Sequence, residues 1–201
     1  MKARIFTVTF LLMLPALMYG QRMRLVSGDL GFLKGVKKVN VVYDYDNMSV
    51  GKFKDEEDYV NKKVKEYNDK EAGRGDNWKK SWEGDRESRF EPKFEELFNK
   101  YMEKYGLEVG DYEDAEYTLI LKTTHTEPGF NVGVARRPAH TNMEAVFVSS
   151  DNSEPKAVVT LEGSPGGGAM GYDFDTGFRL QESYAKAGKE LAKYIIKNGL
   201  K

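Results

Sequence analysis

Apolar and polar residues alternate along several short stretches of the chain, which is the period-two pattern of half-buried β-strands. These stretches are rich in β-branched and aromatic residues, as strands usually are. They span 38–45 (KVNVVYDY), 116–124 (EYTLILKTT), 142–149 (NMEAVFVS) and 156–162 (KAVVTLE). The segment 150–155 (SDNSEP) between the last two is typical of a turn, so we expect a hairpin there. Segment 22–37 indicates a short strand or an extended arm, and 130–134 a further short strand.

Three other segments carry apolar residues at helical spacing. Segment 55–68 has a narrow apolar stripe, and 77–105 has a wider one that is interrupted by Pro92. Because proline cannot donate an N–H inside a helix, we expect two helices there, about 77–89 and 91–105, with Gly106 ending the second. The final helix is predicted over 176–198, capped by Asp175 or Thr176 and ended by Gly199. Its buried stripe comprises Leu180, Tyr184, Ala187, Gly188, Leu191 and Ile195.

The order of these elements predicts the fold class. A strand, helices, a strand, a hairpin and a terminal helix are typical of an α+β domain. We expect a single two-layer domain over residues 21–201, with a mostly antiparallel or mixed sheet and helices packed on one face. A chain of 201 residues is long enough for one well-buried core and short for two.

Residues 1–20 (MKARIFTVTFLLMLPALMYG) have the features of a secretory signal peptide. Lys2 and Arg4 precede an apolar run that is shorter than the roughly 20 residues a membrane span needs, and Gly20 offers a small residue for cleavage. The sequence lacks the cysteine that a lipid anchor would require. We therefore expect an exported protein, periplasmic or extracellular, with no stable membrane insertion after the signal is removed.

Composition excludes several classes of function. The 31 Lys and Arg residues balance 32 Asp and Glu, which argues against nucleic-acid binding because phosphate neutralisation needs clustered cations. A mean hydropathy of −0.62 excludes a polytopic membrane protein. The absence of cysteine excludes a disulfide framework, a thiol nucleophile and a thiolate metal site.

The glycine-rich run and the acidic doublets do not match known ligand loops. The run 163–171 lacks the Gly-Lys-Ser/Thr ending of a phosphate loop, so it is predicted to be a connector. The doublets at Asp44/Asp46 and Asp173/Asp175 lack the later ligands of a calcium loop and are predicted to be a strand-end turn and a helix cap.

The two histidines, His125 and His140, would share a metal only if their strands paired, with Glu127 or Glu144 as a carboxylate. Neither has a second ligand at chelating spacing, so ordinary hydrogen bonding is the favoured interpretation. The scarcity of histidine also weighs against a Ser-His-Asp triad. We therefore predict no catalytic residue, no metal and no cofactor.

One cluster of residues suggests a binding site. Trp78, Trp82, Asp85 and Arg89 share one side of a helix, where aromatic rings, a cation and an acid could recognise a glycan or a peptide. The alternative is structural: the two tryptophans pack the helix onto the sheet while Asp85 and Arg89 form an i,i+4 ion pair.

Four segments resemble a group of exported, uncharacterised proteins of gram-negative bacteria. They are 28–53 (GDLGFLKGVKKVNVVYDYDNMSVGKF), 86–101 (RESRFEPKFEELFNKY), 126–139 (TEPGFNVGVARRPA) and 171–195 (GYDFDTGFRLQESYAKAGKELAKYI). The layout also resembles the α/β domain of periplasmic accessory proteins such as the curli-secretion protein CsgG and the penicillin-binding-protein activators. The chain departs from those by lacking the lipid-bearing cysteine. The resemblance implies no catalytic residue, and likeness of fold alone does not give function.

Two functions from different classes remain open. The first is a non-enzymatic, exported binding or assembly accessory protein that engages a protein or an envelope polymer. The second is a carboxylate-dependent hydrolase acting on an envelope or dietary polymer. An enzyme should show a pocket in which acids of perturbed pKa converge, and a binding module an apolar or aromatic patch or an open sheet edge.

Overall fold

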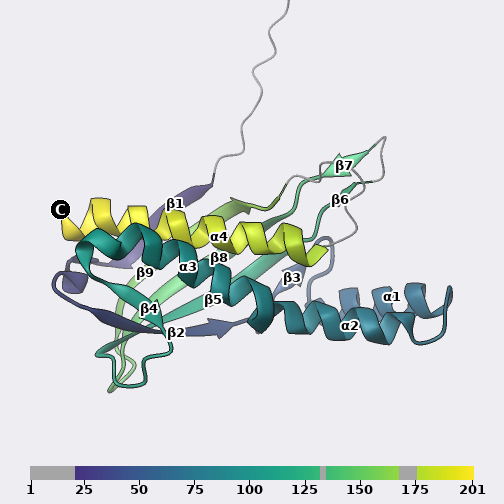
Figure 1. Ribbon diagram of the computed structural model, residues 1–201, viewed down its shortest axis with the longest axis horizontal. Helices are drawn as coiled ribbons and strands as arrows, with labels where there is room; N and C mark the ends of the chain where they lie inside the picture. Colours follow the sequence, from purple (N-terminus) through teal and green to yellow (C-terminus); the bar gives the residue numbers. More distant parts are fainter. Residues whose placement is uncertain (1–20, 132–134, 168–175) are drawn as a thin grey trace, which may run out of the picture.

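The computed structural model describes residues 21–131, 135–167 and 176–201, and its centre is a seven-stranded mixed sheet (Figure 1). The strands follow the order β1-β9-β8-β5-β2-β4, and β3 also pairs with β5. Their bounds are β1 Arg22–Gly28, β2 Lys38–Asp44, β3 Ser49–Val50, β4 Glu108–Gly110, β5 Tyr117–Glu127, β8 His140–Ser149 and β9 Pro155–Pro165. A separate ribbon pairs β6 (Phe130–Asn131) with β7 (Arg136–Arg137).

The sheet has an antiparallel half and a parallel half. The pairs β1–β9, β9–β8 and β8–β5 are antiparallel, whereas β2 runs parallel to both β5 and β4. Strands β8 and β9 form the hairpin that the turn segment predicts. A mixed sheet with helices packed against it confirms the α+β fold class.

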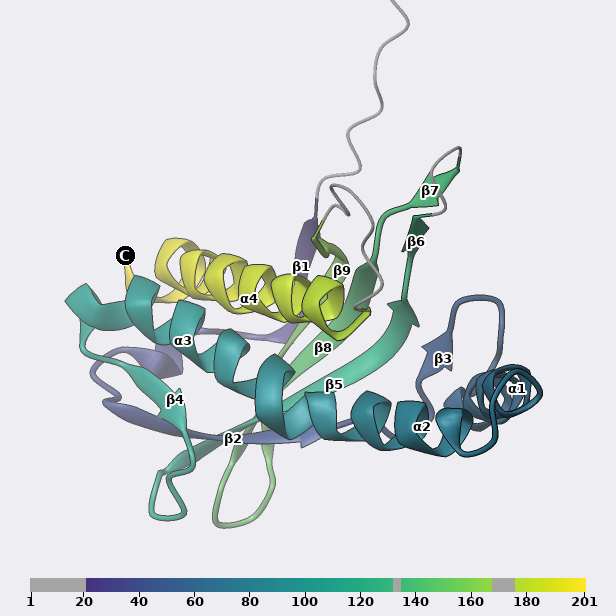
Figure 2. The same cartoon turned by 45° about the vertical axis from the view of Figure 1, so that its right-hand side comes forward.

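Helices α3 (Glu91–Met102) and α4 (Thr176–Ile195) lie side by side across one face of the sheet (Figure 2). Helices α1 (Glu56–Asn68) and α2 (Arg74–Asp85) form an antiparallel pair that extends beyond the sheet. A π-helical segment, η2 (Arg86–Phe90), joins α2 to α3. Short helical segments complete the structure: η1 Gly31–Leu33, η3 Glu103–Tyr105 and η4 Ile196–Leu200.

The core lies between the sheet and the α3–α4 pair. Leu119 and Leu121 of β5 are fully buried, as the alternation along that strand predicts, and so is the whole predicted stripe of α4. The two helices approach closely because Gly188 of α4 has no side chain. A Cβ at Gly188 would overlap the carbonyl oxygen of Phe94 on α3. This contact keeps α4 against α3.

The predicted helix over 55–68 is confirmed, with Asp55 as its N-cap accepting a hydrogen bond from the Asp58 N–H. The predicted start of the second helix is confirmed, since α3 begins at Glu91 with Pro92 in its first turn, where the missing N–H is tolerated. The predicted end of the first helix near residue 89 is wrong, because α2 ends at Asp85 and the π-helical η2 carries the chain on to α3. Gly106 ends this run in the left-handed conformation, as expected.

The predicted stop at Gly199 is also wrong, since η4 carries the helix on to Leu200. Gly199 instead lets the helix pack against the backbone of Leu30, which a Cβ would overlap. Asp175 and the doublet at 173–175 lie outside the described residues, as do residues 1–20 and part of the glycine-rich run. The described part of that run begins as the end of β9 rather than as a connector.

Within the described ranges, the structure holds no helix with both the length and the apolar character that crossing a membrane requires.

Candidate ligand-binding site

Helix α2 carries Trp78 and Trp82 one turn apart, so their side chains lie on the same side of the helix. Their indole rings stack, with centroids 5.6 Å apart and planes at 24°. The helix is held against α1 by Gly75, where a Cβ would overlap the backbone of Val64, and the Gly75 N–H donates to Asn68 Oδ1. The two indoles are therefore placed by a close contact between α1 and α2.

Tyrosines of α1 surround the indole pair. Tyr59 lies 5.9 Å from Trp78 and 5.3 Å from Trp82, and Tyr67 lies 5.8 Å from Trp78, measured between ring centroids. Trp82 is buried, with 7% of its surface exposed, whereas Trp78 is half-buried. Trp82 thus belongs to the core of the helix pair, and Trp78 offers a ring to its surroundings.

A half-buried ion pair fixes the polar edge of Trp82. Glu56 accepts a hydrogen bond from Trp82 Nε1 at 2.5 Å and also from the guanidinium of Arg86. Burial by itself lowers the pKa of Arg86, but the bonds to Glu56 outweigh it, so the net effect is a raised pKa. Arg86 also lies 4.4 Å above the ring of Tyr45. Arg86 is therefore charged and held in place behind the aromatic cluster.

Asp85 and Arg89 form the polar wall of the site. Arg89 Nε donates to Asp85 Oδ1 at 3.0 Å, the i,i+4 pair that the spacing predicts. The first residues of α4 lie against this pair, because a Cβ at Gly177 would overlap Asp85 and come within 3.0 Å of Arg89. The N-terminus of α4 therefore lies directly beside the carboxylate of Asp85.

These elements enclose a cavity of about 430 Å³, which we call the aromatic cavity. All four residues predicted as a binding cluster, Trp78, Trp82, Asp85 and Arg89, contribute to its wall. The other lining residues are Tyr67, Ser81, Thr176 and Gly177. Ser81 could have been suspected from the sequence, because it lies on the same predicted helix as the tryptophans. Tyr67 belongs to the predicted helix that precedes it. Thr176 and Gly177 have no signal in the sequence, because only the tertiary fold brings α4 to this place.

The strands of the two histidines do pair, β5 with β8, and the ring centroids of His125 and His140 lie 5.7 Å apart. His125 Nδ1 is 2.8 Å from Ser49 Oγ, and burial lowers its pKa, with the neighbouring His140 lowering it further. No group of three potential ligands, histidine or carboxylate, that could hold a metal ion was found among the described residues.

Two half-buried carboxylates on α3 have perturbed pKa values. Burial raises the pKa of Glu91 and of Glu95, while hydrogen bonds from Tyr45 to Glu91 and from Tyr43 to Glu95 act in the opposite direction. Each carboxylate is thus engaged by a tyrosine that ties α3 to β2 or to the residue following it. Neither lines the aromatic cavity.

Asp44 and Asp46 form the strand-end turn that was predicted. The Asp46 N–H donates to Asp44 Oδ1 at 2.7 Å, and the other carboxylate oxygen of Asp44 pairs with Lys122 Nζ at 3.3 Å. The carboxylate is therefore used locally.

No protein-family model matches the chain, and no curated protein matches it. Solved structures give partial likenesses. The PelC dodecamer from Paraburkholderia phytofirmans has a TM-score of 0.39 at 12% identity, covering 86% of this chain and 98% of that one. A second crystal form of PelC, carrying one substitution, has a TM-score of 0.37 at 11% identity, covering 83% and 97%.

A third likeness is to a Xanthomonas campestris protein of the family DUF330, with a TM-score of 0.35 at 16% identity over 50% of this chain and 58% of that one. All three neighbours are bacterial proteins. Likenesses at this level define neither a common function nor a common ligand. The predicted resemblance to exported gram-negative proteins and to CsgG-type domains stays a prediction.

Proposed function

We propose that this protein is a non-enzymatic, exported accessory protein that binds a glycan of the cell envelope in the aromatic cavity. The observation that carries this proposal is that all four sequence-predicted residues line one cavity, where the Asp85–Arg89 pair follows the stacked indoles along the same helical run.

The size and lining of the cavity suit a small segment of a ligand. Its volume of about 430 Å³ falls within the range of small-molecule sites, about 300–1,000 Å³. The half-buried indole of Trp78 offers a flat apolar surface to the C–H face of a sugar ring. Asp85 accepts hydrogen bonds and Arg89 donates them, so together they can satisfy neighbouring hydroxyl groups. An aromatic platform with a few polar groups therefore matches the mixed surface of a sugar.

The same cavity favours binding over hydrolysis. Glycoside hydrolysis uses two carboxyl groups about 5–9.5 Å apart on either side of the scissile bond. Among the described residues that line the aromatic cavity, Asp85 is the one carboxylate, and it is paired with Arg89. The carboxylates with raised pKa values, Glu91 and Glu95, lie elsewhere and accept hydrogen bonds from tyrosines. The hydrolase alternative therefore has no supporting observation at this site.

Intrinsic fluorescence tests the proposal directly, because the chain has two tryptophans and both line the cavity. Titration with chitotetraose, a neutral oligosaccharide of N-acetylated sugars, should change the emission in a saturable way.

Calorimetry on the same ligand should show at least a tenfold loss of affinity in Trp78→Ala. Tyr105→Ala serves as the matched control, because Tyr105 is an exposed aromatic residue at the far end of the α3 run. Unchanged emission, or equal affinity in Trp78→Ala, would contradict the proposal.

A further inference from the structure

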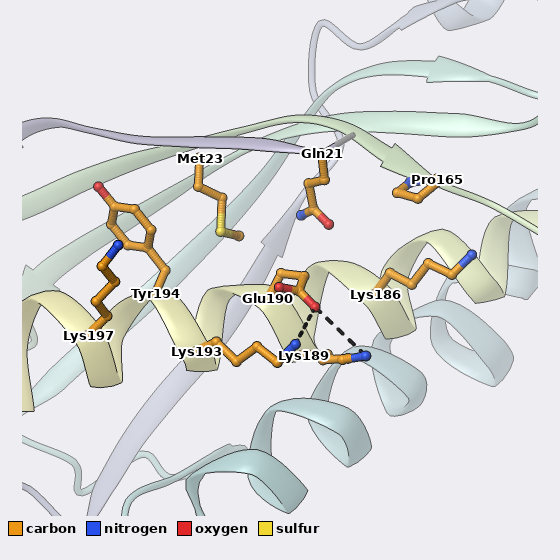
Figure 3. A pocket seen from close by; sticks show the side chains of 9 residues that line it. All are labelled: Gln21, Met23, Pro165, Lys186, Lys189, Glu190, Lys193, Tyr194 and Lys197. Atoms are coloured by element: carbon orange, nitrogen blue, oxygen red, sulfur yellow. Dashed lines mark hydrogen bonds and ion pairs between the residues drawn. The ribbon is translucent and has the colours of Figure 1, made fainter. Parts of the chain in front are cut away.

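A second cavity lies on the opposite half of α4, between this helix and β1 (Figure 3). It has a volume of about 580 Å³, and we call it the α4–β1 groove. The side chains that line it are Gln21, Met23, Pro165, Lys186, Lys189, Glu190, Lys193, Tyr194 and Lys197. The aromatic cavity uses the first residues of α4, so the two sites occupy different ends of the helix.

The groove is strongly basic although the whole chain has a formal charge of −1. Its four lysines, Lys186, Lys189 and Lys193 of α4 and Lys197 of η4, follow one another at spacings of three and four residues. The ammonium groups of Lys189 and Lys193 also lie within 5.5 Å of the ring centroid of Tyr101 on α3. The single carboxylate among them, Glu190, pairs with Lys193 at 2.8 Å and with Lys189 at 3.8 Å. Lys186 and Lys197 have no carboxylate partner among the described residues. The groove therefore keeps a net positive charge.

Strand β1 supplies the opposite wall and is the last strand of the sheet on this side. The Leu25 N–H donates to Tyr194 Oη at 2.9 Å, so it points away from β9 and toward α4. Peptide groups alternate in an antiparallel pair, and the register is regular between Met23 and Leu25. The Met23 N–H therefore also points away from β9, into a position that another strand could occupy.

Gln21, which directly precedes β1, adds to the wall of the groove a polar side chain without hydrogen-bond partners among the described residues. Its side-chain Nε2 and Oε1 are both buried, and neither has a hydrogen-bond partner in the part of the chain that the structure describes. Figure 3 shows this amide pointing toward α4 at Glu190. A buried amide without partners costs free energy, and it needs both an acceptor and a donor. A peptide group offers both, whereas a phosphate or carboxylate offers acceptors alone.

Arg22 and Arg24 restrict which strand could pair here. Both are exposed on β1, on the side of the strand away from the lysines. Cations on an edge strand repel a second basic strand, and they disfavour pairing with an apolar strand because they would lose their hydration. The same charges favour an acidic strand, whose side chains alternate between the two faces. One set would face the lysines and the other would face Arg22 and Arg24.

We propose that the α4–β1 groove binds an extended acidic peptide segment of a partner protein, which adds to the sheet as a strand along β1. Main-chain hydrogen bonds to β1 would provide affinity, and the flanking cations would select acidic side chains. Glycan binding in the aromatic cavity does not enter this inference.

The test uses the full-length protein and a labelled peptide of eight glutamates, acetylated and amidated, which presents acidic side chains on both faces of a strand. Fluorescence anisotropy should show saturable binding that weakens as salt rises. The double variant Lys186→Gln/Lys197→Gln should bind about three- to tenfold more weakly, the effect expected for two exposed charge pairs. The variant Lys54→Gln/Lys104→Gln, which changes two exposed lysines elsewhere, should bind like the wild type.

Strand addition is separated from simple charge attraction by a second peptide with the same side chains and every backbone nitrogen methylated. We expect this peptide to bind at least about tenfold more weakly, and the unmethylated peptide to slow amide exchange at Met23. Equal binding of the methylated peptide or unchanged amide exchange at Met23 would each overturn the proposal. Equal binding of a control peptide of eight lysines, with the same label and end groups, would also overturn it. So would binding of a polygalacturonate oligomer in the absence of binding by the acidic peptide. Chitotetraose should not displace the peptide, whatever its affinity for the aromatic cavity.

Discussion

Trp78 and Trp82 lie one turn apart on α2, yet their surroundings differ. Trp82 is buried against Tyr59 and donates its indole N–H to Glu56, whereas Trp78 is half-buried at the wall of the aromatic cavity. The structural interpretation therefore fits Trp82, and the binding interpretation fits Trp78.

Substituting Trp82 by alanine should mainly destabilise the fold. The change removes a buried aromatic side chain and leaves Glu56 without one of its donors, so the free energy of unfolding should fall by about 3–5 kcal/mol. Urea unfolding at pH 7 measures this loss. Trp78→Ala is the comparison and should lose clearly less, because its side chain is half-buried. A Trp82→Ala protein with unchanged stability and lost ligand binding would contradict the packing role.

His125 should make stability depend on pH. Burial, with a smaller effect of His140, lowers the pKa of His125 below its ordinary value of 6.5, so the folded state binds its proton less readily than the unfolded state. Stability is therefore present at neutral pH and is lost as the pH falls through about 6.5. The His125→Gln variant should show a smaller loss of urea midpoint between pH 7.5 and 5.5. Lys54→Gln should keep the wild-type profile, and an unchanged profile in His125→Gln would contradict this account.

At the scale of elements, the contact between α3 and α4 depends on a glycine. A methyl group at Gly188 would overlap the carbonyl oxygen of Phe94, so Gly188→Ala should lower the free energy of unfolding by about 1–3 kcal/mol. Gly84→Ala on α2 is the matched control, because a Cβ there meets nothing within 4 Å. That control should stabilise the protein by about 0.5–1 kcal/mol through helix propensity. Chemical denaturation of both variants measures the difference, and equal effects would argue against the close crossing.

The elements with long, regular patterns could be predicted from the sequence. The alternation in β2, β5, β8 and β9 and the stripe of α4 give the buried faces correctly, because burial on one side imposes a fixed period. Strands β3 and β4 span two and three residues, too few for a period to be visible. Their pairing with β5 and β2 is decided by tertiary contacts instead.

Pro92 correctly indicates the start of α3, because it lies in the first turn of that helix. The prediction failed at Gly199, which has the character of a helix stop but packs on the backbone of Leu30. The candidate site was predictable to the same extent. Four residues of one helical run were identified by spacing, whereas Thr176 and Gly177 come from a distant helix that only the fold places beside them.

At the scale of the whole molecule, the α1–α2 pair joins the common core at one end only, through Tyr59, Val60 and Trp82. It extends beyond the sheet, while β5, β8 and β9 form the centre of the structure (Figure 2). Segments with fewer buried contacts open more readily than the core. Hydrogen exchange should therefore be faster at the amides of α1 than at those of β5 and β8. Equal protection would indicate that the helix pair and the sheet unfold only together.

The two proposed sites would give the molecule two separate binding functions along one helix. The aromatic cavity would engage a sugar at the start of α4, and the α4–β1 groove would engage an acidic strand along its second half. Such an arrangement suits an accessory protein that links an envelope polymer to a protein partner, and each function can be lost without the other.

Nuclear magnetic resonance of the two indole N–H groups tests glycan binding in the aromatic cavity most directly. The chain has two tryptophans, so two indole signals are expected, and Trp82→Phe assigns them. On addition of chitotetraose, the Trp78 signal should shift strongly, and the Trp82 signal, whose N–H is bound to Glu56, should shift less. If neither indole signal moves at saturating chitotetraose, the aromatic cavity does not bind the glycan and the proposed function is wrong.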